Sequence, residues 1–252
     1  MTVSLNFSHE GAVATVSLAR PEARNALNYA MLEQVSDAFR VADSRGARII
    51  VLRADGPSFC AGADRKAYPG FSSGESNEAL AQHAINIGNR VTQTIASTNA
   101  LTIAQVHGHA VGGGLVLAMC CDMRFTADDA RLSLPELSLG LPLAWGALYR
   151  LIGMVGTTKA WDMLASMEIL SGSEAAQIGL CSAAVPAAEL PGLVSRKIEG
   201  FLKINPQALF LTKRQFRAIS AKASFGNLED LDGSLLLGPL RANTFDNAFE
   251  TP

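Results

Sequence analysis

The stretch HAVGGGLVLAMCCD, from His109 to Asp122, places three consecutive glycines in front of an apolar segment. The residues just before it, 101–106 (LTIAQV), are predicted to form a buried strand. Glycine loses more backbone entropy on folding than any other residue, so three in a row indicate that something approaches the backbone closely here. We therefore predict a strand, a glycine turn and a helix over residues 113–121, which together make a β-to-α unit.

The amide groups at the start of that helix are candidates for binding an anion. The first N–H groups of a helix lack partners within it, and the helix dipole favours negative charge beside them. Such a position suits a phosphate, or an oxyanion that develops during a reaction. Close packing of the helix against another backbone is the alternative explanation. The phosphate-loop, dinucleotide-binding and GxSxG patterns are missing from the sequence, which argues against enzymes that use them.

Strand and helix patterns alternate along the rest of the chain. Segments with the apolar pattern of strands are 12–18, 47–54, 122–126 and 130–134. A long helix is predicted over residues 78–97, and Asn28 is suited to cap a helix that ends near Arg40. The apolar face of the Asn28 helix is formed by Met31, Leu32, Val35 and Phe39. From about Leu143 the pattern is mainly helical, so we predict an α/β protein with a helical C-terminal third.

The composition limits the classes of function. The 252 residues are 48% hydrophobic and 17% charged, with a formal net charge of −2. This is enough apolar chain for one sizeable core, and the low charge favours burial of surface against copies of the same chain. The lack of a basic excess argues against nucleic acid as a partner.

The N-terminus and the cysteines predict a cytoplasmic protein. The start, MTVSLNFSHE, has no basic segment followed by an apolar run, so we expect no targeting signal. No run of about 18 apolar residues indicates a membrane span, so no membrane partner is expected. The four cysteines lack the spacing of a zinc site, and we expect buried thiols and no metal.

Two further stretches complete a candidate site. SFCAGADRK (58–66) follows the predicted strand 47–54, so its small residues form a second loop at a strand end. Two such loops can aim two N–H groups at one oxygen, which is the geometry of an oxyanion hole. In LSLPELSLG (132–140), Glu136 is the only carboxylate between Asp129 and Asp162. If Glu136 is buried, its pKa is raised toward the range useful for proton transfer. If it lies in a solvated turn, its pKa stays near the usual value of a glutamate.

These stretches, in this order, resemble the crotonase superfamily, the enoyl-CoA hydratase/isomerase family. The matching pieces are RPEARNALN (20–28), SFCAGADRK (58–66), HGHAVGGGLVLAMCCD (107–122), LSLPELSLGLP (132–142) and SEAAQIGL (173–180). The resemblance implies a crotonase-like spiral of ββα turns over residues 1–190 and a helical trimerisation region over 191–252. It also implies homotrimers or hexamers, and an acyl-CoA thioester as substrate with no separate cofactor.

The resemblance also implies roles for particular residues. The amides of Ala63 and Gly113 would hold the thioester oxygen, and Glu136 would transfer the proton. Other positions would contact coenzyme A (Arg24, Ala61, Asp64 and Lys66) or line the acyl pocket (Val116, Leu141 and Trp145). Lys213 resembles, less specifically, a C-terminal lysine that can reach coenzyme A. His107 and His109 are expected to be turn histidines without a catalytic role.

The sequence departs from the family pattern at two positions. Hydratases of this family use two glutamates, and Val116 stands where one of them is expected. One carboxylate suffices to move a double bond, whereas adding water is more naturally shared by two, so we predict an enoyl-CoA isomerase. Hydration is the alternative, and non-catalytic acyl-CoA binding is the alternative of another class. In LPLAWG (141–146), Trp145 stands where small residues are usual, so it narrows the acyl pocket or packs in the core.

Overall fold

The computed structural model describes residues 2–64, 66–67 and 78–223 of the chain. Its larger sheet has six strands in the order β1-β2-β3-β4-β6-β9. Their bounds are β1 Val3–Ser8, β2 Val13–Leu18, β3 Ile49–Ala54, β4 Leu101–Val106, β6 Met123–Ala127 and β9 Ala183–Val185. All neighbours are parallel except β1 and β2, which are antiparallel.

A smaller sheet lies at the end of the larger one. It consists of β5 (His109–Val111), β7 (Arg131–Ser133) and β8 (Leu170–Ser171). Two isolated parallel bridges, Leu27 to Ala63 and Cys60 to Ala110, involve the segments that follow β2 and β3. Most turns of the chain therefore repeat one pattern: a strand in the large sheet, a short extended segment beyond it, and then a helix. This is the spiral that the resemblance implies.

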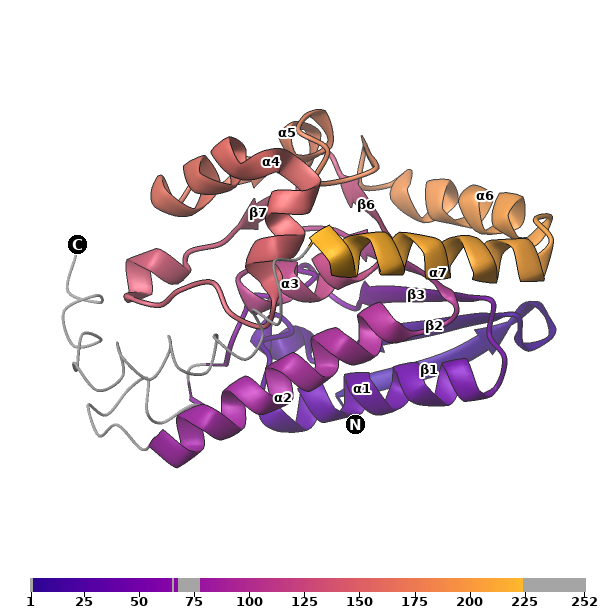
Figure 1. Cartoon of the computed structure of the whole chain (residues 1–252), viewed down its shortest axis with the longest axis horizontal. Coiled ribbons are helices and arrows are strands. Elements are labelled where there is room, and N and C mark those ends of the chain that lie inside the picture. Colours follow the sequence, from indigo (N-terminus) through magenta and orange to yellow (C-terminus); the bar gives the residue numbers. More distant parts are fainter. Residues whose placement is uncertain (1, 65, 68–77, 224–252) are drawn as a thin grey trace.

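The helices cover the larger sheet, as Figure 1 shows. Helix α1 (Tyr29–Ser44) packs beside α2 (Glu78–Ser97), and α3 (Gly113–Cys120) packs against α2 and α4 (Ala147–Ala165). The side chain of Asn28 accepts a hydrogen bond from the Met31 amide, which confirms the predicted cap. The predicted apolar face of α1 is fully buried. Helix α4 is kinked at Gly156, where φ is +77°.

The C-terminal helices pack on the same core as the spiral. Helix α5 (Gly172–Gln177) leads to β9, and α6 (Leu190–Leu202) and α7 (Pro206–Ala223) follow. Leu190, Val194 and Ile198 of α6 belong to the single hydrophobic cluster. The division of the chain at residue 190 stays a prediction, and residues 224–252 of the expected helical region lie outside the described residues. Among the described helices, none is long and apolar enough to span a membrane.

The strand and helix predictions agree with the structure where the local pattern is strong. Helix 78–97 and strand 101–106 have the predicted bounds, and all four cysteines are buried free thiols. Strands β1, β5, β8 and β9 were not predicted. Three of them have two or three residues, too few for a periodic pattern to show.

Candidate active site

The segment after β3 presents Ala63 through a bridge with Leu27. The Leu27 amide donates to the Gly62 carbonyl, and the Asp64 amide donates to the Leu27 carbonyl, both at 2.8 Å. Leu27 is thus bonded to the Gly62 carbonyl and the Asp64 amide, the residues on either side of Ala63. Successive residues of an extended segment point their N–H groups in opposite directions, so the N–H of Ala63 points away from Leu27. Ala63 is exposed, and within the described part of the chain its amide makes no hydrogen bond. That N–H is therefore available to a ligand.

The glycine run makes the second loop. Gly112 has φ of +49°, a left-handed conformation that favours glycine, and its amide donates to the Ser133 carbonyl (2.9 Å). Gly113 is the first residue of α3, so its N–H has no acceptor within the helix. Gly113 is partly exposed, and none of the described residues accepts a hydrogen bond from its amide. A second N–H group is thus available.

Each of the three glycines meets a different neighbour. An added β-carbon would lie 3.0 Å from Glu136 Oε1 at Gly112, 2.8 Å from Trp145 Cζ3 at Gly113, and 2.6 Å from Cys60 Cβ at Gly114. Gly114 is therefore required for close packing, which was the alternative explanation of the run. Gly112 and Gly113 instead face Glu136 and Trp145, two of the predicted site residues, and binding of an anion at this turn stays a prediction.

The two loops are fixed to one another. The Cys60 amide donates to the His109 carbonyl (2.8 Å), and the Val111 amide donates to the Cys60 carbonyl (3.0 Å). A β-carbon added to Gly62 would lie 3.0 Å from the Val111 oxygen. Ala63 follows Gly62 directly and Gly113 lies two residues after Val111, so these contacts hold the segments that carry the two predicted amides next to one another.

Glu136 lies beside the glycine turn. It begins a short 3-10 helix, η4 (Glu136–Leu139), and its carboxylate contacts Gly112. Its Oε2 atom is enclosed and has no hydrogen-bond partner among the described residues. Burial raises the pKa of Glu136 to about 7, although a hydrogen bond from its own backbone acts in the opposite direction. This carboxyl group can therefore take up and release a proton near neutral pH.

Trp145 and Leu141 also lie at this place. The indole of Trp145 contacts Gly113, and the Leu141 amide donates to the Glu136 carbonyl (3.0 Å). Leu141 is buried, whereas Trp145 is only partly buried. Val116, one turn into α3, is 2% exposed and belongs to the hydrophobic core, so it contributes an apolar side chain and no carboxylate.

The residues predicted to contact coenzyme A surround the first loop. The Ala61 amide donates to the carbonyl of Arg24. Arg24 is exposed and has φ of +49°. Partial burial opposes ionisation of Asp64, but a hydrogen bond and ion pair with Arg20 lower its pKa overall. Lys66 is exposed, and its amide donates to the Asp64 carboxylate (3.1 Å). Contact of any of these with coenzyme A stays a prediction.

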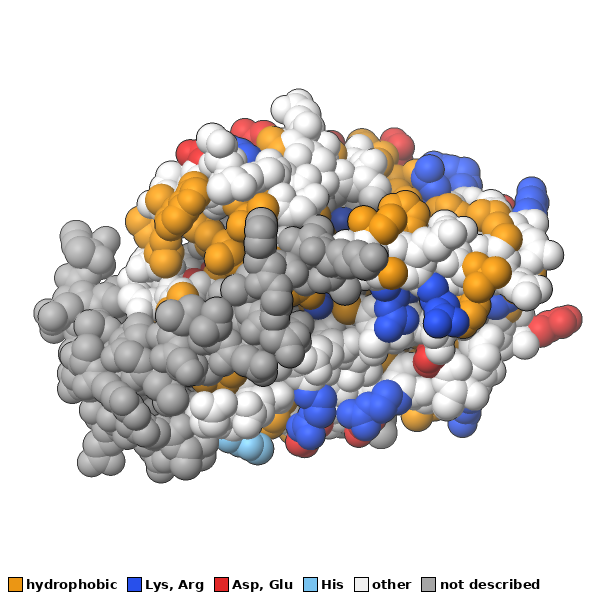
Figure 2. Space-filling model, in the orientation of Figure 1, with side chains coloured by type: hydrophobic (Ala, Val, Ile, Leu, Met, Phe, Trp, Pro, Cys, Tyr) orange, Lys and Arg blue, Asp and Glu red, His pale blue; other side chains and the backbone are white. Residues whose placement is uncertain are grey.

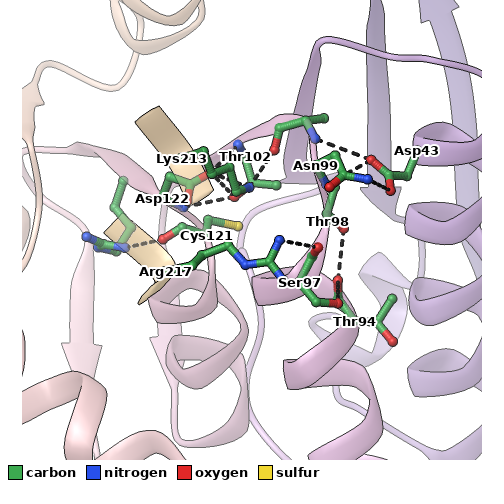
Figure 3. A network of polar contacts seen from close by, with 12 residues as sticks. Asp43, Thr94, Ser97, Thr98, Asn99, Thr102, Cys121, Asp122, Lys213 and Arg217 are labelled. Atoms are coloured by element: carbon green, nitrogen blue, oxygen red, sulfur yellow. Dashed lines mark hydrogen bonds and ion pairs between the residues drawn. The ribbon is translucent and has the colours of Figure 1, made fainter. Parts of the chain in front are cut away.

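Lys213 has a structural environment that differs from the one suggested by the resemblance. It is 5% exposed, and its ammonium group donates to the Ala100 carbonyl and pairs with Asp122 (2.7 Å), as Figure 3 shows. Asp122 also accepts from the amide and the hydroxyl of Thr102. In this chain Lys213 therefore joins α7 to β4 and to the end of α3, and its ammonium group is already engaged.

Sequence reasoning missed three residues that shape the site, although all lie in the quoted motif RPEARNALN. Arg20 pairs with Asp64, and Leu27 holds the loop around Ala63. Asn25 is fully buried with φ of +54°, and its amide group donates to the carbonyls of Asp55 and Ser58. An asparagine suits this conformation, which was the available signal. His107 contacts the Gly56 carbonyl just after β4, whereas His109, expected in a turn, begins strand β5 and contacts the Ser58 hydroxyl.

Comparison with known proteins identifies the family of this chain. The family model described as "Enoyl-CoA hydratase/isomerase" matches residues 8–229. A Bacillus subtilis (strain 168) protein named "Probable enoyl-CoA hydratase" is 35% identical over 242 residues, 95% of this chain and 88% of that protein. The "Crotonyl-CoA hydratase" of Syntrophomonas wolfei is 32% identical over 244 residues, 96% of this chain and 88% of that protein.

Solved structures show the same fold. A probable enoyl-CoA hydratase from Mycobacterium thermoresistibile has a TM-score of 0.86 at 25% identity and covers 98% of both chains. Enoyl-CoA hydratase from Bacillus halodurans has a TM-score of 0.90 at 17% identity, over 98% of this chain and 99% of that one. The chain belongs to the enoyl-CoA hydratase/isomerase family of the crotonase superfamily, whose members act on acyl-CoA thioesters.

Proposed function

We propose that this chain is an enoyl-CoA double-bond isomerase that moves a proton along the acyl chain by way of an enolate. The observation that carries the proposal is the enclosed carboxyl group of Glu136 beside the glycine turn. Its pKa of about 7, raised by burial, lets it exist as a base and as an acid at neutral pH. A group that removes a proton and then returns it needs both forms.

The reaction uses one carboxylate and two amides. The thioester oxygen accepts hydrogen bonds from the N–H groups of Ala63 and Gly113. Glu136 removes a proton from the α-carbon of a 3-enoyl thioester, and the electron pair moves onto the thioester oxygen as an enolate forms. The protonated Glu136 then delivers the proton to the γ-carbon, which leaves the double bond between the α- and β-carbons. The two amides stabilise the enolate more than the substrate because negative charge gathers on the oxygen.

The side chain at position 116 supports isomerisation over hydration. Hydration requires a water molecule to be held and deprotonated while a proton goes to the α-carbon. Val116 is apolar and buried, and helix α3 carries no acidic residue. The second carboxylate that hydratases of the family use is thus missing from its expected position.

Hydration is the second candidate, because the relatives favour it. The Bacillus subtilis and Syntrophomonas wolfei proteins are both named hydratases, and their names give no support to isomerisation over hydration. If this chain hydrates enoyl-CoA, the group that activates the water comes from a position other than 116.

Ultraviolet absorbance of the conjugated thioester distinguishes these reactions. A 3-enoyl-CoA and, separately, a 2-enoyl-CoA are incubated with the purified protein. Absorbance that rises with the first and stays constant with the second is the result expected for an isomerase. Absorbance that falls with the second identifies a hydratase. Binding of both esters without any change in absorbance supports non-catalytic acyl-CoA binding, which the enclosed carboxyl group of Glu136 makes the least favoured candidate.

We also propose that the chain assembles into a homotrimer or hexamer. Figure 2 shows hydrophobic side chains gathered over α4 and along α7. The exposed large hydrophobic residues on these helices are Leu148, Ile152, Trp161, Leu211, Phe216 and Ile219. Patches of this kind on a soluble protein mark interaction surfaces. We also propose that the protein is cytoplasmic and that its reaction uses no separate cofactor.

A further inference from the structure

The indole of Trp145 spans the gap between helix α2 and the first residue of helix α3. A β-carbon added to Gly88 of α2 would lie 2.0 Å from both Nε1 and Cε2 of the indole. One added to Gly113 would lie 2.8 Å from Cζ3 and 3.1 Å from Cη2. The five-membered ring therefore rests on Gly88, and the outer edge of the six-membered ring rests on Gly113. A side chain at either glycine would occupy the space that the indole fills.

The backbone of Trp145 is strained in this position. Its φ is +60°, a left-handed conformation that a bulky side chain rarely adopts, and Gly146 follows with φ of +62°. Such a conformation persists only where the surrounding contacts hold it, and residues of this kind cluster at functional sites. Here the contacts are with two bare glycine backbones, one of which carries an amide of the proposed oxyanion hole.

Trp145 packs against the hydrophobic core but is not sealed within it. Trp145 keeps part of its surface exposed, whereas Leu141 and Leu143 in the same segment are 8% and 6% exposed. Non-bonded carbon atoms pack about 3.5–4.0 Å apart. A β-carbon on Gly113 would lie only 2.8 Å from the six-membered ring, so no methylene group fits between the ring and this backbone.

We propose that Trp145 is the specificity-determining residue of the acyl pocket and that it restricts this enzyme to short-chain acyl-CoA thioesters. The inference rests on the proposed placement of the thioester oxygen at Ala63 and Gly113. An acyl chain leaves the thioester carbon next to Gly113, and on one side of it the volume is taken by the indole. A longer chain on that side would have to displace the ring from its position between Gly88 and Gly113.

The kinetic test compares chain lengths in variants of Trp145. We expect Trp145→Ala to raise kcat/KM for an eight-carbon enoyl-CoA relative to the four-carbon ester by about 10-fold or more, since one methylene group in an apolar pocket contributes about 10-fold or more. Trp145→Phe, which keeps an aromatic ring and preserves the fold better, should give a smaller change in the same direction. Trp161→Phe is the matched control, because Trp161 is the other of the two tryptophans and is 64% exposed. An unchanged ratio in both Trp145 variants overturns the proposal.

A binding test separates this inference from the proposed reaction. Butyryl-CoA and octanoyl-CoA have no double bond to isomerise or hydrate, so calorimetric affinity reports the pocket alone. We expect the wild-type protein to bind butyryl-CoA at least as tightly as octanoyl-CoA, and Trp145→Ala to reverse this order. Wild-type protein that already prefers octanoyl-CoA overturns the role of Trp145. A reversal of affinities in a protein that turns over neither enoyl-CoA supports the role of Trp145 and rejects the proposed reaction.

Discussion

The carboxylate oxygen Oε1 of Glu136 lies against Gly112, close enough that a β-carbon on this glycine would be 3.0 Å from it. The next residue, Gly113, begins helix α3, and no described residue accepts a hydrogen bond from its amide. The proposed base therefore contacts the glycine turn one residue before the proposed oxyanion donor.

The pH dependence of turnover should follow the ionisation of Glu136. A base must be deprotonated to accept a proton, so kcat/KM should rise with pH through about 7, the pKa of Glu136, and then level off. Glu136→Gln should lower kcat by at least about 100-fold and leave the affinity for coenzyme A esters nearly unchanged. Initial rates and calorimetry measure these effects, and an active Gln variant would remove Glu136 from the mechanism.

The stability of the protein should also depend on this carboxyl group. Its pKa is raised from 4.5 to about 7, so between these values the folded protein binds more protons than the unfolded chain. The free energy of unfolding should therefore fall as pH rises through this window, by at most ~3 kcal/mol. Glu136→Gln cannot titrate, so its stability relative to wild type should increase from pH 5 to pH 7. Urea unfolding at several pH values measures the difference, and parallel curves would contradict it.

Gly114 should tolerate no side chain. An alanine β-carbon there would lie 2.6 Å from Cys60 Cβ and 2.9 Å from the Cys60 carbonyl oxygen, so the two loops must separate. We expect Gly114→Ala to cost about 1–3 kcal/mol of stability and to lower kcat, because Ala63 moves relative to Gly113. Gly153→Ala is the control: Gly153 is an exposed residue of α4, and an added β-carbon meets nothing within 4 Å. Equal thermal melting and equal rates for the two variants would refute this expectation.

The ion pair of Lys213 with Asp122 should stabilise the docking of helix α7. Lys213→Met removes a buried charge-assisted contact, and we expect a loss of about 2 kcal/mol in the free energy of unfolding. Arg217→Met, one turn further along α7, loses an exposed hydrogen bond to the Ser97 carbonyl and should change stability by less than about 0.5 kcal/mol. Denaturant titration compares the two variants; similar losses would show that burial of Lys213 is not what matters.

Assembly should depend on the apolar residues of helix α7. Phe216 and Ile219 are 69% and 67% exposed. A charge placed in an apolar interface is left without a partner, so Ile219→Asp should reduce the mass measured by light scattering toward that of one chain. Ser195→Asp adds the same charge at an exposed polar position of α6, outside the apolar residues of α7, and should leave the mass unchanged. An Ile219→Asp protein with the wild-type mass would exclude this helix from the interface.

The sequence by itself determined those elements that depend on local chemistry. The side chain of Asn28 caps α1, and the spacing of apolar residues defines the buried face of this helix. The bounds of α2 and β4 follow from the local pattern of residues. The glycine run and the AGAD loop also predicted two strand-end loops with available amides. Each of these features needs only contacts between residues close in the sequence, or the spacing of residues within one segment.

Only the tertiary structure decided how these pieces meet. In the smaller sheet, β5 and β8 have three and two residues and pair with distant segments, so no local pattern marks them, whereas β7 lies within the predicted strand 130–134. The enclosure of Glu136, the contact of Trp145 with Gly88 and Gly113, and the pairing of Lys213 with Asp122 join residues far apart in the chain. Burial and electrostatics at these points depend on the assembled core, so the sequence and its family resemblance could name candidate site residues but not their environments.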